Sequence, residues 1–215
     1  MRKLVEFTVT ARFPLLLLCL VITGIFLLQS RNAKLYDDPN EWLPAGNPIS
    51  RLNAYLQEKF GGGNLVTIQV SVKEGDIFNA ATLAKVKRMT REVLLTWGVI
   101  PYNVLSVAAL QVRYLKATDE YLDNTPLMDE VPKTPEAMER MRYGVTHNPT
   151  IYGVLVSPDS QSTIIVADFR TGSGFRAGLP TTEPVAIYKR IEAIISAERD
   201  DQHVIQAAGT PITIG

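Results

Sequence analysis

Residues 65–72 read Leu-Val-Thr-Ile-Gln-Val-Ser-Val, and this alternation of apolar and polar side chains decides the fold class. Successive side chains of a β-strand point to opposite faces, so the four apolar residues at even positions are expected to face a core, and the polar ones water. A strand of this kind needs a second layer to cover its apolar face. The segments on either side of it supply candidates for that layer.

Apolar residues recur at helical spacing both before and after this strand. Before it, residues 49–60 predict a helix with Asn47 or Ser50 as its N-cap. After it, Asn79 is the expected N-cap of a second helix. The apolar stripe of this second helix contains Leu83, Val86, Met89, Val93, Leu94 and Trp97.

Further short strands are expected at 99–107, 151–156, 163–169 and 203–207. The runs at 151–156 and 163–169 are joined by turn-forming residues, which predicts a hairpin. A strand that starts at 203 is expected to end before the glycine and proline that follow it.

Two more helices are expected in the second half of the chain. Thr134 is the natural N-cap of a short helix at 135–143, and another helix starts near Pro184. The apolar side of the latter contains Ile187, Tyr188, Ile191, Ile194 and Ile195. The acidic, proline-punctuated stretch at 118–135 predicts an exposed connection between the two halves.

The order of elements is therefore β-α-β, an acidic connection with a short helix, and then β-β-α-β. Strands interleaved with helices of this size indicate an α+β sandwich of the split βαβ, ferredoxin-like kind.

An apolar segment near the N-terminus indicates a membrane helix. Residues 13–30 carry no charge and are bracketed by Arg12 and Arg31. As a helix they would span about 27 Å, which approaches the thickness of a bilayer's hydrocarbon core. A buried core helix and a cleaved signal peptide are the alternatives. The apolar run is long for a signal peptide, and Arg31 and Lys34 occupy the place of a small-residue cleavage site. The charges before the helix slightly favour a cytoplasmic N-terminus.

Composition narrows the function classes. The 215 residues contain 22 basic and 22 acidic side chains, so no net positive charge is available to hold a nucleic acid. Cys19 is the only cysteine and lies in the apolar segment, so neither a disulfide nor a thiolate metal site is expected.

No motif indicates catalysis or a cofactor. The glycines at 61–63 follow a helix, the reverse of a phosphate-binding loop, and those at 172–178 do not open a βαβ unit. His147 and His203 lack ligand spacing, and the acidic residues between 119 and 130 lack the order of a calcium loop. We expect no enzyme activity, no metal and no cofactor, and the substrate-binding residues stay unknown.

The order of loose motifs along nearly the whole chain carries a family resemblance. After the apolar segment come Asp-Asp-Pro-Asn-Glu-Trp-Leu-Pro at 37–44, Phe-Gly-Gly at 60–62, Ile-Phe at 77–78, Val-Leu-Ser-Val at 104–107, Asn-Pro at 148–149, Gly-Val-Leu-Val-Ser-Pro-Asp at 153–159 and Gly-Thr-Pro at 209–211. In this order the chain resembles the start of a resistance–nodulation–division (RND) exporter. The similar branch includes the large mycobacterial membrane proteins and the hopanoid-type lipid exporters.

The resemblance implies a proton-driven exporter of lipid or hydrophobic substrates, of which this chain would supply the first helix and first periplasmic loop. It implies a cytoplasmic segment at 1–12, a transmembrane helix at 13–30, a connecting segment and helix at 31–64, and a periplasmic porter-like domain at 65–215. In the family, proton coupling uses acidic residues on a later transmembrane helix. The 215 residues of this sequence do not contain such a helix. The chain is therefore expected to be an N-terminal fragment that cannot transport alone.

The expected partners are the lipid bilayer of the bacterial inner membrane, the rest of the transporter or an exporter subunit, and a hydrophobic or lipid substrate. The alternative is a free-standing single-pass protein whose periplasmic domain binds a lipid or an exporter subunit. A secreted enzyme behind a cleaved signal peptide is a third reading.

Overall fold

The computed structural model of the chain describes residues 11–30, 47–60, 63–117, 122–171, 175–176 and 179–214. The chain divides into two compact units, Met1–Trp42 and Leu43–Gly215. Within the predicted connecting segment and helix at 31–64, residues 31–46 and 61–62 lie outside the described residues.

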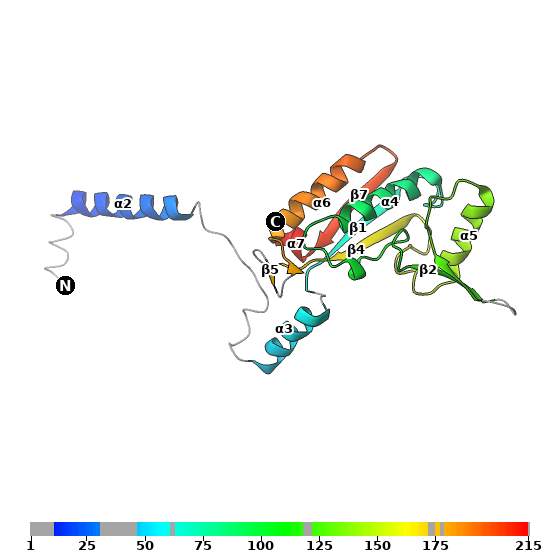
Figure 1. Cartoon of the computed structure of the whole chain (residues 1–215). Coiled ribbons are helices and arrows are strands. Elements are labelled where there is room, and N and C mark those ends of the chain that lie inside the picture. Colours follow the sequence, from blue (N-terminus) through cyan, green and yellow to red (C-terminus); the bar gives the residue numbers. More distant parts are fainter. Residues whose placement is uncertain are drawn as a thin grey trace. The chain divides into compact units, whose positions relative to one another are not determined.

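Helix α2 (Arg12–Ser30) is the described part of the first unit (Figure 1). Among the described residues, no helix is both long enough and apolar enough to cross a membrane. The apolar run in α2 ends at Leu28, because Gln29 and Ser30 are polar, and residues 13–28 span only about 24 Å against a hydrocarbon core of about 30 Å. The predicted helix is therefore present, but the predictions of a transmembrane span at 13–30 and of an inner-membrane location with a periplasmic domain are wrong.

A three-stranded antiparallel sheet forms the centre of the second unit. Its strands are β1 (Leu65–Val72), β4 (Ser162–Asp168) and β7 (His203–Gly209), in the order β4-β1-β7. The side chains at even positions of β1 are buried, as the alternation predicts. Val70 illustrates the register, since it pairs with Thr163 of β4 and with Ile205 of β7.

The strand order follows from two crossing βαβ connections. Both neighbours of β1 run antiparallel to it, so β4 and β7 are parallel to each other, and helix α6 (Pro184–Glu198) joins them across β1. On the far side of β4, Leu105 pairs with Val166 after helix α4 (Ala80–Leu94). The second unit is thus α+β with each βαβ connection split by an inserted strand.

The strand predicted at 99–107 is absent as a continuous element. Val99 and Leu105 form isolated bridges to Phe169 and Val166, and the short helix η2 (Pro101–Asn103) separates them. Proline fixes φ and lacks an N–H, so Pro101 interrupts the ladder.

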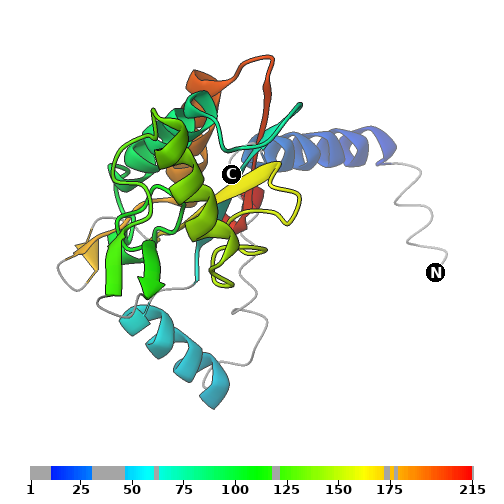
Figure 2. The same cartoon turned by 90° about the vertical axis from the view of Figure 1, so that its right-hand side faces the viewer.

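Helices α4 and α6 lie side by side over one face of the sheet (Figures 1 and 2). Asn79 caps α4 by accepting a hydrogen bond from the Thr82 amide at 2.8 Å, as predicted. The isoleucines of the α6 stripe are buried, whereas Tyr188 is not. The core between the helices and the sheet contains Val66, Ile68, Val70, Leu83, Val86, Met89, Val93, Ile165, Ile187 and Ile191.

Helix α5 (Pro135–Thr146) begins at the predicted cap, because Thr134 Oγ1 accepts from the Ala137 amide. It packs on a hairpin of β2 (Arg113–Ala117) and β3 (Leu122–Pro126). The interpretation of 118–135 as an exposed connection is therefore wrong for β3, while 118–121 lie outside the described residues. Gly144 permits the close packing, since a Cβ there would lie 2.5 Å from Cδ2 of Tyr114.

The remaining elements are short or peripheral. Helix α3 (Pro48–Phe60) is capped by Asn47, but its apolar stripe is exposed rather than buried. The segment at 151–156 forms turns and isolated bridges instead of the first strand of a hairpin. Strands β5 (Phe175–Arg176) and β6 (Leu179–Pro180) form a two-stranded pair, and α7 (Thr210–Ile214) follows β7. At the junction, Gly209 has φ +132°, and a Cβ there would lie 2.0 Å from the Leu65 carbonyl oxygen.

Candidate functional site

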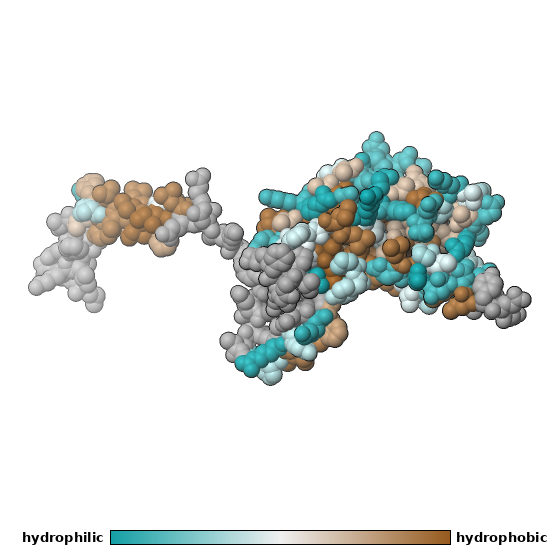
Figure 3. All heavy atoms as spheres, viewed as in Figure 1, coloured by the Kyte–Doolittle hydropathy of each residue, from teal (hydrophilic) through white to brown (hydrophobic). Residues whose placement is uncertain are grey.

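The chain that leaves the end of α4 carries a group of exposed apolar side chains. Trp97 is 59% exposed, Leu95 67% and Leu110 65%. We call the following residues the apolar surface patch: Leu94, Leu95, Trp97, Tyr102, Leu105 and Leu110. Figure 3 shows exposed hydrophobic surface where the chain leaves α4. Contiguous exposed apolar surface is typical of sites that bind a protein, a ligand or a lipid.

Backbone hydrogen bonds hold the patch segment against the edge of β4. The Leu105 amide donates to the Val166 carbonyl and the Val166 amide donates back, both at 2.8 Å. The Ile100 amide donates to the Asp168 carbonyl at 2.8 Å. The side chains of Ile100 and Val104 are buried. The same segment therefore contributes to the core on one side and presents apolar groups on the other.

The sequence placed Leu94 and Trp97 in the core-facing stripe of α4, and this prediction is wrong. Helix α4 ends at Leu94, so Trp97 lies in the turn beyond it and no longer follows the helical period. The signal that could have identified the patch is the run Val93-Leu94-Leu95, because consecutive residues of a helix cannot all face the protein core.

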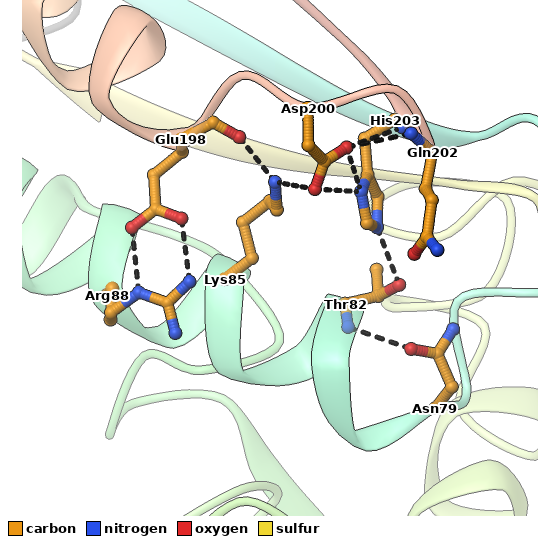
Figure 4. Close-up of polar contacts among 8 residues, drawn as sticks. All are labelled: Asn79, Thr82, Lys85, Arg88, Glu198, Asp200, Gln202 and His203. Atoms are coloured by element: carbon orange, nitrogen blue, oxygen red, sulfur yellow. Dashed lines mark hydrogen bonds and ion pairs between the residues drawn. The ribbon is translucent and has the colours of Figure 1, made fainter.

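A second group of interacting residues links α4 to the turn between α6 and β7 (Figure 4). Lys85 Nζ lies 2.7 Å from Asp200 Oδ2 and also donates to the carbonyl of Glu198. Asp200 Oδ1 lies 2.8 Å from Nδ1 of His203, and His203 Nε2 lies 2.9 Å from Thr82 Oγ1. Arg88 forms a two-pronged contact with the Glu198 carboxylate, with both distances 2.7 Å. We call these six residues the polar cluster.

The charges in the polar cluster stabilise its carboxylates. The hydrogen bond from Lys85 lowers the pKa of Asp200, assisted by His203 and by the backbone amides of Gln202 and His203. The hydrogen bond from Arg88 lowers the pKa of Glu198. Both acids are therefore ionised at neutral pH, and Lys85, which is only 5% exposed, has a counter-charge there.

Thr82, His203 and Asp200 follow the hydroxyl, imidazole and carboxylate order of a nucleophilic triad. Such a site needs a hydroxyl that a substrate can reach, and Thr82 is 1% exposed in the first turn of α4. An open hollow of about 480 Å³ lies beside Thr82 and His203. Charged residues line it, including Lys73, Glu74 and Asp201. The arrangement holds β7 against α4 and supports an architectural role.

The sequence missed the polar cluster, although one signal was present. Thr82 and Lys85 fall on the same helical face as the apolar stripe of α4, and a lysine on a core-facing side requires a partner. The partner, Asp200, lies 115 residues along the chain, so local pattern could not identify it.

The residues weighed as ligands do not converge. His203 is in the polar cluster, whereas His147 stacks on Tyr143, with ring centroids 3.9 Å apart. Within the described ranges, no three His, Cys, Asp or Glu side chains are grouped to hold a metal. Asp123 contacts Arg140, and Asp119 and Glu120 lie outside the described residues. The glycines at 61–62 and 172–178 lie outside them also.

No family model and no curated protein matches the chain.

Proposed function

We propose that the second unit is a porter-type domain of an RND-type exporter, and that the apolar surface patch contacts its lipid or hydrophobic substrate. The domain acts by binding and is not an enzyme. An exporter subunit is the other partner that this surface fits. The motif order described above motivates the class of protein, and the patch motivates the chemistry of the partner.

The observation that carries the proposal is the exposure of Trp97 and its neighbours in a domain whose core is otherwise well filled. Met89 and Val93, on the same helix, are fully buried, so the exposure of Leu95 and Trp97 does not reflect a poorly packed region. Burial of apolar surface releases about 25 cal/mol per Å², so an apolar partner that covers the exposed side chains of Leu95, Trp97 and Leu110 gains binding energy.

Quenching of Trp97 fluorescence tests this proposal directly. Trp42 is the only other tryptophan, so Trp42→Phe leaves Trp97 as the single reporter in the full chain. A brominated short-chain phospholipid quenches tryptophan on contact. If the lipid binds at Trp97, we expect the quenching to saturate as lipid is added. Quenching without binding at this side chain would not saturate.

A matched pair of variants identifies the surface. Leu95→Glu places a charge inside the patch, whereas Val185→Glu places one on an apolar side chain of α6 that is 45% exposed and lies outside the patch. Leu95→Glu should weaken the interaction about ten-fold or more, and Val185→Glu should leave it unchanged. Equal effects of the two variants, or absence of quenching in the parent, would refute a lipid-binding role for the patch.

A further inference from the structure

The outer edge of β7 carries backbone groups that the sheet does not use. The Lys73 amide donates to the Gln202 carbonyl at 3.0 Å, so the even-numbered residues of β7 direct their amide and carbonyl groups toward β1. The odd-numbered residues direct theirs outward. Among the described residues, no hydrogen bond reaches the outward groups of Ile205 or Ala207.

Both ends of this edge are already occupied. The His203 amide donates to Asp200 Oδ1 at 2.9 Å, and Thr213 Oγ1 donates to the Gly209 carbonyl at 3.1 Å. The opposite edge of the sheet is covered too, because Leu105 bonds to Val166 of β4. The open part of the sheet edge in the described unit is therefore the centre of β7, at residues 205–207.

The features that normally guard an edge strand are absent from β7. Natural edges carry lysines, prolines or bulges that prevent pairing with another strand. The sequence of β7, His-Val-Ile-Gln-Ala-Ala-Gly, contains no proline and no Lys, Arg, Asp or Glu. This strand is free to accept another strand along its outer edge.

A groove runs beside the open edge. It has a volume of about 330 Å³ and lies between α6 and β7. Its apolar lining includes Ile191, Ile195, Ile205, Ala207 and Ile212. Strand addition requires backbone groups for hydrogen bonds and a hollow for alternate side chains, and both are present.

We propose that the occupant is β7 of a second copy of this chain, in an antiparallel arrangement about a two-fold axis at Gln206. In this register Ile205 of each copy pairs with Ala207 of the other, so the four unpaired backbone groups of each copy bond across the axis. The two sheets become one continuous sheet of six strands. The interface is self-complementary, as a two-fold interface must be.

Charges on α6 fit the same axis. Glu192 and Arg199 lie at the groove and form an ion pair at 3.1 Å within one copy. Because the two-fold axis makes α6 of the second copy antiparallel to the first, it brings Glu192 of one copy toward Arg199 of the other. Each copy thus offers one charge of each sign to its mate, whereas a uniformly charged peptide would find no matching charge.

Position-specific cross-linking in the full chain tests the register. In a Cys19→Ser background, Gln206→Cys places two sulfhydryls opposite each other across the axis, at a Cα separation of about 4.5 Å that suits a disulfide. Val204→Cys is the matched control on the same face of β7. In the proposed dimer, Val204 opposes Ala208 of the second copy, so the two Val204 positions are about 13 Å apart.

Mild oxidation should convert the Gln206→Cys chain to covalent dimer at least about ten-fold faster than the Val204→Cys chain. Equal rates would indicate non-specific association and would overturn the proposal. The absence of cross-linking in both variants at concentrations where light scattering detects a dimer would also overturn it.

Charge exchange provides a second readout that does not depend on disulfide geometry. Gln206→Lys and Gln206→Glu each place like charges face to face across the axis, so each variant alone should be monomeric. An equimolar mixture should recover the dimer, as seen by light scattering. Failure of the mixture to recover it, with both variants folded by circular dichroism, would refute pairing at Gln206.

Discussion

Lys85 Nζ lies 2.7 Å from Asp200 Oδ2, and this contact joins the middle of α4 to the turn that starts β7. The lysine side chain is 6% exposed, whereas the aspartate side chain is 41% exposed. The contact therefore holds a buried cation by a carboxylate that water also reaches. This difference in exposure determines the expected effects of replacing Lys85 and of replacing Asp200.

Replacing the lysine should destabilise the second unit. Lys85→Met keeps the aliphatic length but removes the charge, so the Glu198 carbonyl loses its lysine donor and Asp200 loses one of its several donors. Because water partly solvates Asp200, we expect a loss of about 1–2 kcal/mol in the free energy of unfolding. Urea unfolding measures it. Arg91→Met, at an exposed position of the same helix, is the control and should change the value by less than about 0.5 kcal/mol.

The hydroxyl of Thr82 should contribute through His203. Thr82→Val preserves the shape of the side chain but removes the group that lies 2.9 Å from His203 Nε2. A buried polar atom without its partner costs about 1–3 kcal/mol, which urea unfolding detects. Thr82→Ser retains the hydroxyl and should lose no more than about 1 kcal/mol, for the missing methyl group. If Val is tolerated better than Ser, the hydrogen bond has no stabilising role.

The stability of the second unit should fall in acid, and Asp200 should account for part of the fall. Its pKa is lowered in the folded state, chiefly by the hydrogen bond from Lys85. A lowered pKa stabilises the folded state at pH values above the unfolded-state pKa of about 3.9. This stability is lost as the pH falls below about 4. Urea midpoints at pH 5, 4 and 3 should therefore decline.

Asp200→Asn should make that decline shallower without abolishing it, because Glu198 also has a lowered pKa. Asp201→Asn is the matched control, since among the described residues its side chain makes no hydrogen bond or ion pair with another residue. The same pH dependence in the Asp200 and Asp201 variants would contradict the assignment.

Gly144 should resist replacement by alanine. Alanine is favoured over glycine in a helix by about 0.5–1 kcal/mol. A Cβ at Gly144 would nevertheless lie 2.5 Å from Tyr114 Cδ2 and 2.9 Å from Leu127 Cδ1. We expect Gly144→Ala to destabilise the packing of α5 on the β2–β3 hairpin by about 1–3 kcal/mol. Thermal unfolding measures this, with the exposed Thr146→Ala as control on the same helix.

The sequence was sufficient wherever the determining interactions are local. The alternation in β1 predicted its buried face, and Asn79 and Thr134 predicted two helix starts because a cap acts within three residues. The sequence was insufficient where contacts between distant segments determine the local structure. The bridge at Leu105 depends on β4, and the strand predicted around it is interrupted at Pro101.

Two features could not be derived from periodicity. The β2–β3 hairpin packs against α5, yet three of the five β3 residues are exposed, so no alternating pattern marks that strand. The polar cluster joins residues on α4 to residues more than 100 positions later. At the N-terminus, the uncharged run at 13–30 predicts a transmembrane helix, but the polar residues Gln29 and Ser30 at its end leave too short an apolar length.

The central position of β1 has a consequence for synthesis. Ser71 of β1 meets Ser162 of β4 91 residues later in the chain, and β7 is more distant still. When β1 leaves the ribosome, neither of its neighbours exists, so its apolar face stays unpaired until both have been translated. Pairings of such long sequence separation form slowly and leave strands exposed to aggregation. The nascent chain therefore passes through an interval in which a chaperone that shields strand β1 should raise the yield of folded protein.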